Sequence, residues 1–274
     1  MSMKSLLPTV MVFGGNGFLG SKIVTEFLNT NRYNVIVASR SLAGKQHSLS
    51  HSPFLQYKSV DIFNPATYKS ILTNVDHVVH SIGIINPNEN YKKIINSKTP
   101  CQFANGLMDY FFKSTTKNTS AVDKNVNQYE LYNYQSCKIL ADVFKDVIKS
   151  SNTNTSTHKR SFTYISAEET PLVKNFISAD YITTKRKAEL HVLQYEDYFT
   201  PIILRPGFMY DENSTDTTPR SAIACILNNS NIIKNKSFTC SIQSVSKEVV
   251  RKIEDPKFQE GGIITLADIK RDFI

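Results

Sequence analysis

Short apolar runs alternate with amphipathic segments along most of this chain. The first run, residues 10–13, is followed by apolar residues at helical spacing, and the alternation continues toward the C-terminus. Runs typical of strands occupy residues 10–13, 35–39, 57–62, 76–83, 162–166, 202–205 and 263–266, and helical patterns begin near residue 20 and cover 129–150, 181–194, 220–227 and 245–253. Strands that alternate with helices predict an α/β fold with a doubly wound parallel sheet.

The turn between the first strand and the first helix is rich in glycine. It consists of Gly14, Gly15, Asn16, Gly17, Phe18, Leu19 and Gly20. Glycines accept a positive φ and let a pyrophosphate approach the backbone, while the start of the helix attracts an anion. A merely tight connection is the alternative interpretation, but the strand before and the helix after favour a dinucleotide site.

The second strand ends at Ser39 and Arg40, twenty residues after Gly20. An acidic residue at this place binds the ribose 2′-hydroxyl of NAD, whereas an arginine accommodates the 2′-phosphate of NADP. Arg40 therefore favours NADP(H), and a solvated arginine at a strand end is the alternative.

Two later strand ends supply further candidates for contact with the cofactor. Asp61 and Ile62 end the third strand, where they are placed to meet the adenine, although Asp61 is equally suited to capping a helix. Ser81 and Gly83 end the fourth strand, and the missing side chain of Gly83 would let the cofactor pass close to the backbone.

Tyr181 and Lys185 lie four residues apart in a predicted helix and so share one face. A nearby ammonium group stabilises a phenolate and lowers the tyrosine pKa from ~10 toward the range of a general acid–base. Ser166, at the end of the preceding strand, could orient a substrate carbonyl, and Lys185 could also hold the nicotinamide ribose. These residues predict the reactive end of the cleft, although the Tyr-x-x-x-Lys pattern alone has little specificity.

The charge composition of the chain indicates which classes of binding partner to expect. The chain has 274 residues, with 32 Lys and Arg against 24 Asp and Glu, and a formal charge of +8. Such a balance suits nucleic acid, an anionic membrane or a compartment of basic proteins. No block of five or six basic residues occurs, so we expect solvated surface and no nucleic-acid site.

Other features argue against a metal site and a membrane span. The four cysteines are far apart, which predicts free thiols in a reducing compartment. His77 and His80 lie in a strand and should point to opposite faces, so no metal is expected. No apolar run approaches the ~18 residues of a membrane span. Only eight residues precede the first strand, too few for an ordinary cleaved presequence.

We expect one nucleotide-binding domain over residues 1–274, interrupted by an insertion at 85–128 and followed by a reduced substrate lobe at 207–250. The insertion is polar apart from a cluster of apolar residues near its middle. A cover over the site, a docking surface and disorder are all compatible with this composition.

Five features, in this order, resemble the extended and atypical short-chain dehydrogenase/reductases: Gly14-x-x-Gly17-x-x-Gly20, Val-Val-His-Ser at 78–81, Asn133, Tyr181-x-x-x-Lys185 and Leu-Arg-Pro-Gly at 204–207. The glycine segment, Ser-Phe-Thr-Tyr-Ile-Ser-Ala at 161–167 and Arg-Pro-Gly-Phe-Met-Tyr-Asp-Glu at 205–212 look more narrowly like a fungal mitochondrial branch. That branch is associated with coenzyme Q (ubiquinone) biosynthesis and is related to the NADPH-binding accessory subunit of respiratory complex I.

The resemblance implies an NAD(P)-binding Rossmann fold, NADP(H) as cofactor, Pro206 near the cofactor and Asn133 in a proton relay. It also implies a location on the matrix side of the mitochondrial inner membrane and partners among the coenzyme Q biosynthetic proteins, with peripheral membrane contact. A quinone-like ligand follows as the expected substrate class. A nucleotide-loaded scaffold or accessory subunit without turnover is the alternative function.

Overall fold

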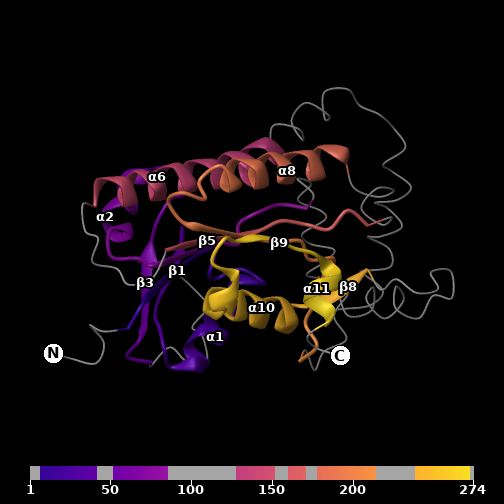
Figure 1. The fold of residues 1–274 in the computed structure, drawn as a ribbon, viewed down its shortest axis with the longest axis horizontal. Helices are drawn as coiled ribbons and strands as arrows, with labels where there is room; N and C mark the ends of the chain where they lie inside the picture. Colours follow the sequence, from indigo (N-terminus) through magenta and orange to yellow (C-terminus); the bar gives the residue numbers. More distant parts are fainter. Residues whose placement is uncertain are drawn as a thin grey trace, which may run out of the picture.

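The computed structural model describes residues 7–41, 52–85, 128–151, 160–170, 178–213 and 238–271. Its centre is a seven-stranded sheet in which every neighbouring pair is parallel (Figure 1). The strands are β1 (Thr9–Phe13), β2 (Asn34–Ser39), β3 (Leu55–Ser59), β4 (His77–His80), β5 (Ser161–Ile165), β6 (Thr200–Leu204) and β9 (Gly262–Ile264), in the order β3-β2-β1-β4-β5-β6-β9. This order confirms the predicted doubly wound sheet.

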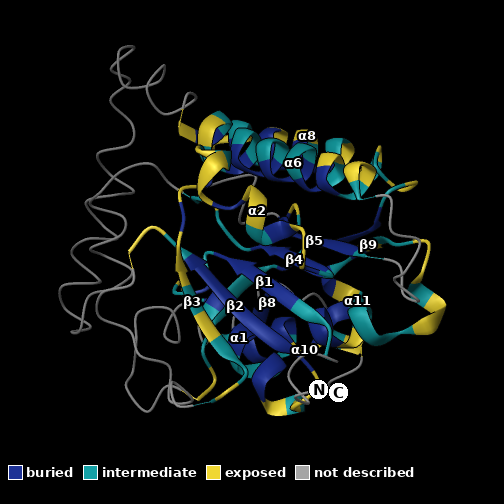
Figure 2. Cartoon of the chain, turned by 90° about the vertical axis from the view of Figure 1, so that its left-hand side faces the viewer, coloured by how far each residue is buried: buried dark blue, intermediate teal, exposed yellow. Residues whose placement is uncertain are grey.

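Helices cover both faces of the sheet. In Figure 1, α6 (Ser136–Ser150) and α8 (Ala179–Leu193) lie above it, and α1 (Gly20–Thr30) and α10 (Ile242–Glu254) lie below. Alternation along β1 divides its side chains, so that Val10 and Val12 join one core and Met11 and Phe13 the other. The central strands are accordingly buried on both sides (Figure 2), which explains their nearly continuous apolar sequences.

Several smaller elements complete the described chain. A 3₁₀ turn (Pro65–Thr67) and α2 (Lys69–Leu72) follow β3, and a second 3₁₀ turn (Pro256–Phe258) and α11 (Leu266–Arg271) flank β9. The predicted helix at 129–150 begins as a π-helix, η3 (Glu130–Gln135), before it continues as α6. The strands β7 (Phe208–Tyr210) and β8 (Thr239–Ser241) form a separate parallel pair that sequence analysis does not predict.

Some predicted boundaries need correction. The third strand ends at Ser59 rather than at residue 62, because the Asp61 carboxylate accepts the amide of Phe63 and turns the chain. The fourth strand ends at His80, where its pairing with β1 ends. Within the expected lobe at 207–250, residues from Ile242 onward belong to α10, which packs against α1 beside the sheet. Residues 86–127 and 214–237, which include most of the insertion and the helix expected at 220–227, lie outside the described residues.

Candidate functional site

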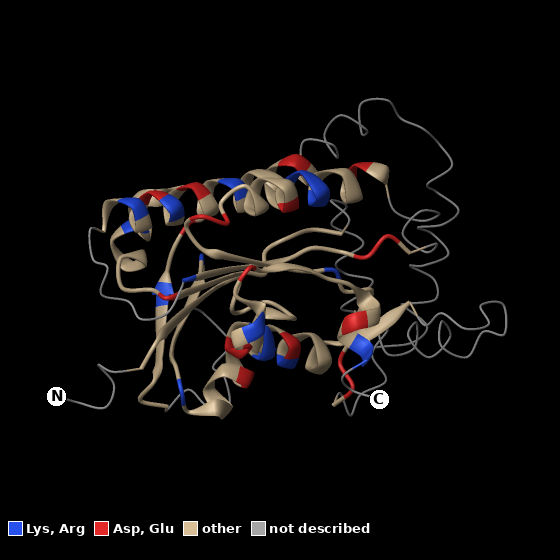
Figure 3. Ribbon diagram, in the orientation of Figure 1, with Lys and Arg blue, Asp and Glu red and all other residues tan. Residues whose placement is uncertain are grey.

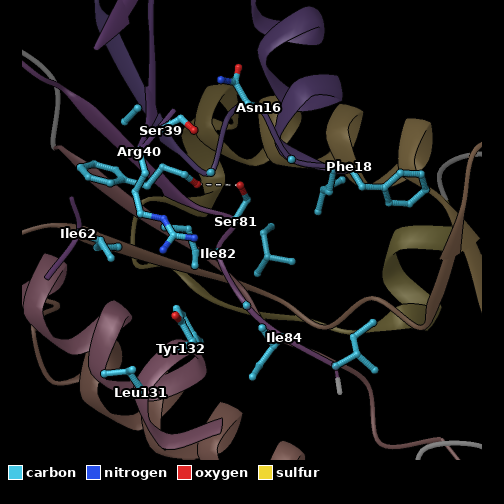
Figure 4. Close-up of a pocket in the computed structure, with 18 of the residues that line it drawn as sticks. Asn16, Phe18, Ser39, Arg40, Ile62, Ser81, Ile82, Ile84, Leu131 and Tyr132 are labelled. Atoms are coloured by element: carbon cyan, nitrogen blue, oxygen red, sulfur yellow. Dashed lines mark hydrogen bonds between the residues drawn. The ribbon is translucent and has the colours of Figure 1, made fainter. Parts of the chain in front are cut away.

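A cleft of about 810 Å³ opens at the carboxyl ends of the central strands (Figure 4). Its walls come from the last residues of β1, β2 and β5, from residues that follow β1 to β5, and from η3, α8 and β7 (Phe208–Tyr210). The strand order reverses between β1 and β4, and this crossover is where open α/β sheets bind ligands. The cleft lining is Phe13, Gly14, Asn16, Gly17, Phe18, Leu19, Ala38, Ser39, Arg40, Val60, Ile62, Phe63, Ser81, Ile82, Gly83, Ile84, Ile85, Gln128, Leu131, Tyr132, Ile165, Ser166, Tyr181, Lys185 and Met209.

The glycine turn forms one wall of the cleft and depends on its missing side chains. Gly14 has a φ of 81°, in the left-handed region that favours glycine, and its N–H donates to Ala38 O at 2.9 Å. A Cβ on Gly20 would collide with Gly14 O and with the Ser81 hydroxyl. Glycine at position 20 therefore lets the start of α1 lie directly against β1 and β4.

The start of α1 suits an anion. No side chain caps this helix within the described chain, and its first turn contains no acidic residue. The helix dipole and the backbone amides there favour a phosphate. Asn16 Oδ1, on the same turn, is buried without a hydrogen-bond partner among the described residues, which leaves an acceptor for a ligand hydroxyl. The turn thus fits the diphosphate and ribose of a dinucleotide.

Arg40 follows β2 directly and is exposed, and its side chain extends into the cleft (Figure 4). Asn16 Nδ2 donates to Ser41 O at 3.0 Å and so ties the glycine turn to the chain just after Arg40. Ser39 also lines the cleft. The cationic side chain thus lies beside the turn that fits the diphosphate.

The wall beyond Arg40 is apolar. Ile62 and Phe63 lie opposite Tyr132 of η3, whose ring meets Phe63 edge to face at 5.8 Å between centroids. Asp61 does not line the cleft, and its carboxylate caps the turn at Phe63. For Asp61 the structure therefore shows the capping interaction, and this side of the cleft is lined by its apolar neighbours Ile62 and Phe63.

Lys185 and Tyr181 lie on α8 at the other end of the cleft and are 4% and 7% exposed. The Lys185 ammonium donates to Ile165 O at 2.9 Å and lies 4.9 Å from the centre of the Tyr164 ring. A Cβ on Gly83 would come within 2.9 Å of Lys185 Nζ, so the end of β4 passes close to the lysine. Burial lowers the pKa of Lys185 to about 8.

Ser166 lines the cleft beside Lys185, but its hydroxyl is already engaged by protein groups. It donates to Glu189 Oε1 and accepts from Arg186 Nη1 at 3.2 Å. Glu189 is only 2% exposed. In this arrangement Ser166 has no second proton to donate to a substrate carbonyl.

Asn133 is fully buried in η3 and does not line the cleft. Its Oδ1 accepts from Ile84 N at 2.8 Å and its Nδ2 donates to Ile84 O at 3.1 Å. Its backbone carbonyl accepts from the Tyr164 hydroxyl at 2.8 Å. Asn133 therefore holds the chain leaving β4, and each of these groups already has a protein partner.

The remaining predicted contacts divide between the cleft and the structure behind it. Gly14, Gly17, Phe18, Leu19, Ser81 and Gly83 line the cleft, whereas Gly15, Gly20 and Pro206 do not. A Cβ on Gly15 would lie 3.0 Å from Val12 O and from Val37, so this glycine packs behind the turn. Pro206 O accepts from Glu168 N at 2.8 Å and steadies the loop after β6.

Residues at both ends of the expected insertion at 85–128 contribute to the cleft, and neither is predicted individually from the sequence. Ile85 and Gln128 both line the cleft, and the Tyr129 hydroxyl donates to Ile85 O at 3.0 Å. The described residues that flank 86–127 therefore lie at the cleft. The position of Ile85 shortly after the predicted strand 76–83 is the sequence feature that indicates its place at the cleft.

The two histidines of β4 face opposite sides of the sheet, as predicted. His77 pairs with Ser161 and meets Tyr33, whereas His80 pairs with Ser136 and meets Tyr164. In the described chain, no group of three or more His, Cys, Asp or Glu side chains could hold a metal. Within the same residues, no helix is both long and apolar enough to cross a bilayer.

Comparisons with known proteins identify a family and a relative that match most of the chain. Residues 10–242 match the NAD dependent epimerase/dehydratase family. MIOREX complex component 2 from Saccharomyces cerevisiae is 39% identical over 284 residues, which span 96% of this chain and 99% of the relative.

Two solved structures show the same fold at low identity. UDP-glucuronic acid 4-epimerase from Bacillus cereus, in complex with NAD, is 16% identical with a TM-score of 0.58, over 94% of this chain and 77% of that one. The Bordetella bronchiseptica enzyme WbmF, in complex with NAD+ and UDP, is 17% identical with a TM-score of 0.57, over 96% of this chain and 73% of that one.

Proposed function

The chain belongs to the NAD dependent epimerase/dehydratase family, and from this premise we propose that it binds NADP(H) as a short-chain dehydrogenase/reductase-like component of a mitochondrial protein assembly. The nucleotide would lie along the cleft, with its diphosphate at the glycine turn and its nicotinamide near Tyr181 and Lys185. Bound there, it would supply hydride-transfer chemistry.

The observation that carries the preference for NADP(H) is the position of Arg40. It follows β2 directly, reaches into the cleft and lies next to the glycine turn, where a 2′-phosphate is expected (Figure 4). A guanidinium group binds a phosphate through paired hydrogen bonds, whereas an NAD-selective site places a carboxylate here. The family description and the solved relatives support a dinucleotide; the additional phosphate is our inference from Arg40.

Replacing Arg40 by alanine tests this assignment. Loss of a charge-assisted hydrogen bond should weaken NADPH binding by roughly 10- to 100-fold and change NADH binding little. Calorimetric titration of both nucleotides measures the ratio. Lys149→Ala, which removes an exposed charge at the far end of α6, is the matched control. Equal losses of both nucleotides in Arg40→Ala would refute selection by Arg40.

The assembly in which the protein works is proposed from its relatives. The name of the yeast relative denotes a component of a complex, and we propose that this chain is also a component of a protein complex. The mitochondrial location at the matrix side of the inner membrane and the role in ubiquinone biosynthesis follow from the resemblance of its motifs. The cluster of Tyr129, Ala167 and Tyr181, with Ile84 and Ile85 packed against it, gives the reactive end an apolar wall that suits a quinone-like ring.

A non-catalytic, nucleotide-loaded subunit is the second candidate, and specific contacts favour it. The Ser166 hydroxyl is bonded to Glu189, and both polar groups of the Asn133 side chain are bonded to Ile84. An oxidoreductase of this type would need, besides Tyr181, a second donor to orient the substrate carbonyl. In this second candidate function, the nucleotide is bound as a structural ligand, and no hydride is transferred to a substrate.

A further inference from the structure

Glu189 is a buried carboxylate beside the reactive end of the cleft, to which sequence analysis assigns no role. It lies one helical turn after Lys185 on α8 and is 2% exposed. Arg205, which directly follows β6, donates to it from Nε at 3.0 Å and from Nη2 at 2.5 Å. Arg186 donates from Nη1 at 2.5 Å. Glu189 therefore connects α8 with the carboxyl ends of β5 and β6.

Side chains of α8 fix the chain at the end of β5 through hydrogen bonds. Three consecutive residues, 165–167, are each held by a different side chain of one helical segment. Lys185 Nζ donates to Ile165 O at 2.9 Å, Ser166 Oγ donates to Glu189, and Arg186 Nη2 donates to Ala167 O at 3.0 Å. The position of the Lys185 ammonium thus depends on a carbonyl whose neighbours are fixed by Glu189 and Arg186.

Glu189 also contributes to the charge state of Lys185. Burial lowers the pKa of Lys185 to about 8, the Cys137 thiol and the Glu189 carboxylate act in the opposite direction, and Arg186 adds to the lowering. The Cys137 thiol belongs to α6, and the other groups that face Lys185 are the Tyr164 ring of β5 and His80 of β4. Among these described groups, Glu189 is the only carboxylate.

We propose that Glu189 is a positioning residue: it places a buried carboxylate one helical turn from the Lys185 ammonium, which favours that charged group, and it holds the Ser166 hydroxyl away from the cleft. The reactive end then presents a fixed ammonium group and no free serine donor. The placement of Lys185 against a bound nucleotide rests on the proposed function, but the effect of Glu189 on Lys185 does not.

The test follows the titration of Lys185 in the nucleotide-free protein by NMR of its ¹³C-labelled ε-carbon, identified by its loss in Lys185→Arg. In Glu189→Gln the midpoint should fall by about one pH unit, because a neighbouring opposite charge has been removed. In Arg186→Gln it should rise, because a neighbouring like charge has been removed. Glu130→Gln, which breaks the pair with Lys187 at the outer surface of the helices, is the control and should leave the midpoint unchanged.

Shifts of opposite sign in the two variants distinguish an electrostatic role from loss of packing, which would not reverse with the sign of the removed charge. An unchanged midpoint in Glu189→Gln overturns the proposal. If Glu189→Gln does not fold, because it leaves the partly buried Arg186 and Arg205 without their carboxylate, the double variant Glu189→Gln/Arg186→Gln is compared with Arg186→Gln. A midpoint in the double variant that is no lower than in Arg186→Gln overturns the proposal. These readouts need no nucleotide, so a failure to bind NADPH would count against the proposed function alone.

Discussion

At the scale of single residues, the chemistry of the cleft depends on how Lys185 and Tyr181 are surrounded. Lys185 is buried, rests on the Tyr164 ring and donates to the end of β5. Tyr181 lies one turn earlier on the same helix and packs with Tyr129 and Ile84. The pair is suited to hold a nicotinamide ribose whether or not a proton is transferred.

Replacing Tyr181 by phenylalanine separates binding from catalysis, since it removes only the hydroxyl. If the protein is an oxidoreductase, the variant should lose hydride transfer by roughly 100-fold or more, while NADPH affinity changes only a few-fold. The measurement is NADPH oxidation with quinone-like acceptors, next to a binding titration. Turnover that persists in this variant would contradict the role of Tyr181 as general acid. Absence of turnover in the wild-type protein, with intact binding, would favour the nucleotide-loaded subunit.

The sequence predicts some residues of the site because their signals are local. Arg40 is identified by its place directly after a strand. Ser166 illustrates the limit, since it is predicted to orient a substrate, yet its hydroxyl bonds to Glu189, 23 residues away. That contact depends on how α8 docks on the sheet, which no local pattern encodes. The spacing of Glu189 four residues after Lys185 gives only a weak indication of the cluster.

At the scale of elements, the unit of β1, the glycine turn and α1 provides the best-defined part of the site. Gly20 permits α1 to begin against Gly14 O, and the apolar stripe of α1, including Ile23, Val24 and Phe27, holds the helix on the sheet. The amide groups at the start of α1 are thereby held at the edge of the cleft. We therefore expect nucleotide binding and stability to be coupled in this unit.

Replacing Gly20 by alanine should therefore lower both the stability of the protein and its affinity for NADPH. The added Cβ would overlap a backbone oxygen, so α1 must move, at a cost of roughly 1–3 kcal/mol in the free energy of unfolding and with loss of NADPH affinity. Urea denaturation and nucleotide titration measure the two effects. Gly17→Ala is the matched control, since its Cβ would meet only Gly14 O at 3.0 Å and should cost less stability. Equal stability of Gly20→Ala and the wild type would contradict the close packing.

The strands and the long helices of the fold are predictable, because buried parallel strands have continuous apolar sequences and the helices have periodic ones. Two other elements are not. The π-helix η3 leads directly into α6, and its six residues are too few for the spacing of apolar residues to distinguish the two helix types. The strands β7 and β8 have only three residues each, and they lie far apart in the sequence. Neither length nor spacing therefore indicates that they pair.

At the scale of the whole molecule, the cleft lies at the carboxyl ends of the central strands, while the charges on the surface are mixed. Figure 3 shows both signs alternating along α6 and α8, as in the pairs of Lys138 with Asp142 and Lys187 with Glu130. The positive net charge is therefore not concentrated on these helices. The structure instead places a cation, Arg40, within the cleft beside the glycine turn, where it would decide between nucleotides (Figure 4).

The most direct test of this account is calorimetric titration of the wild-type protein with NADPH and with NADH at the same pH and ionic strength. We predict that each nucleotide binds at one site per chain and that NADPH binds at least about tenfold more tightly, because only NADPH carries the 2′-phosphate that Arg40 would bind. Equal affinities, tighter binding of NADH, or no binding of either nucleotide would contradict the account.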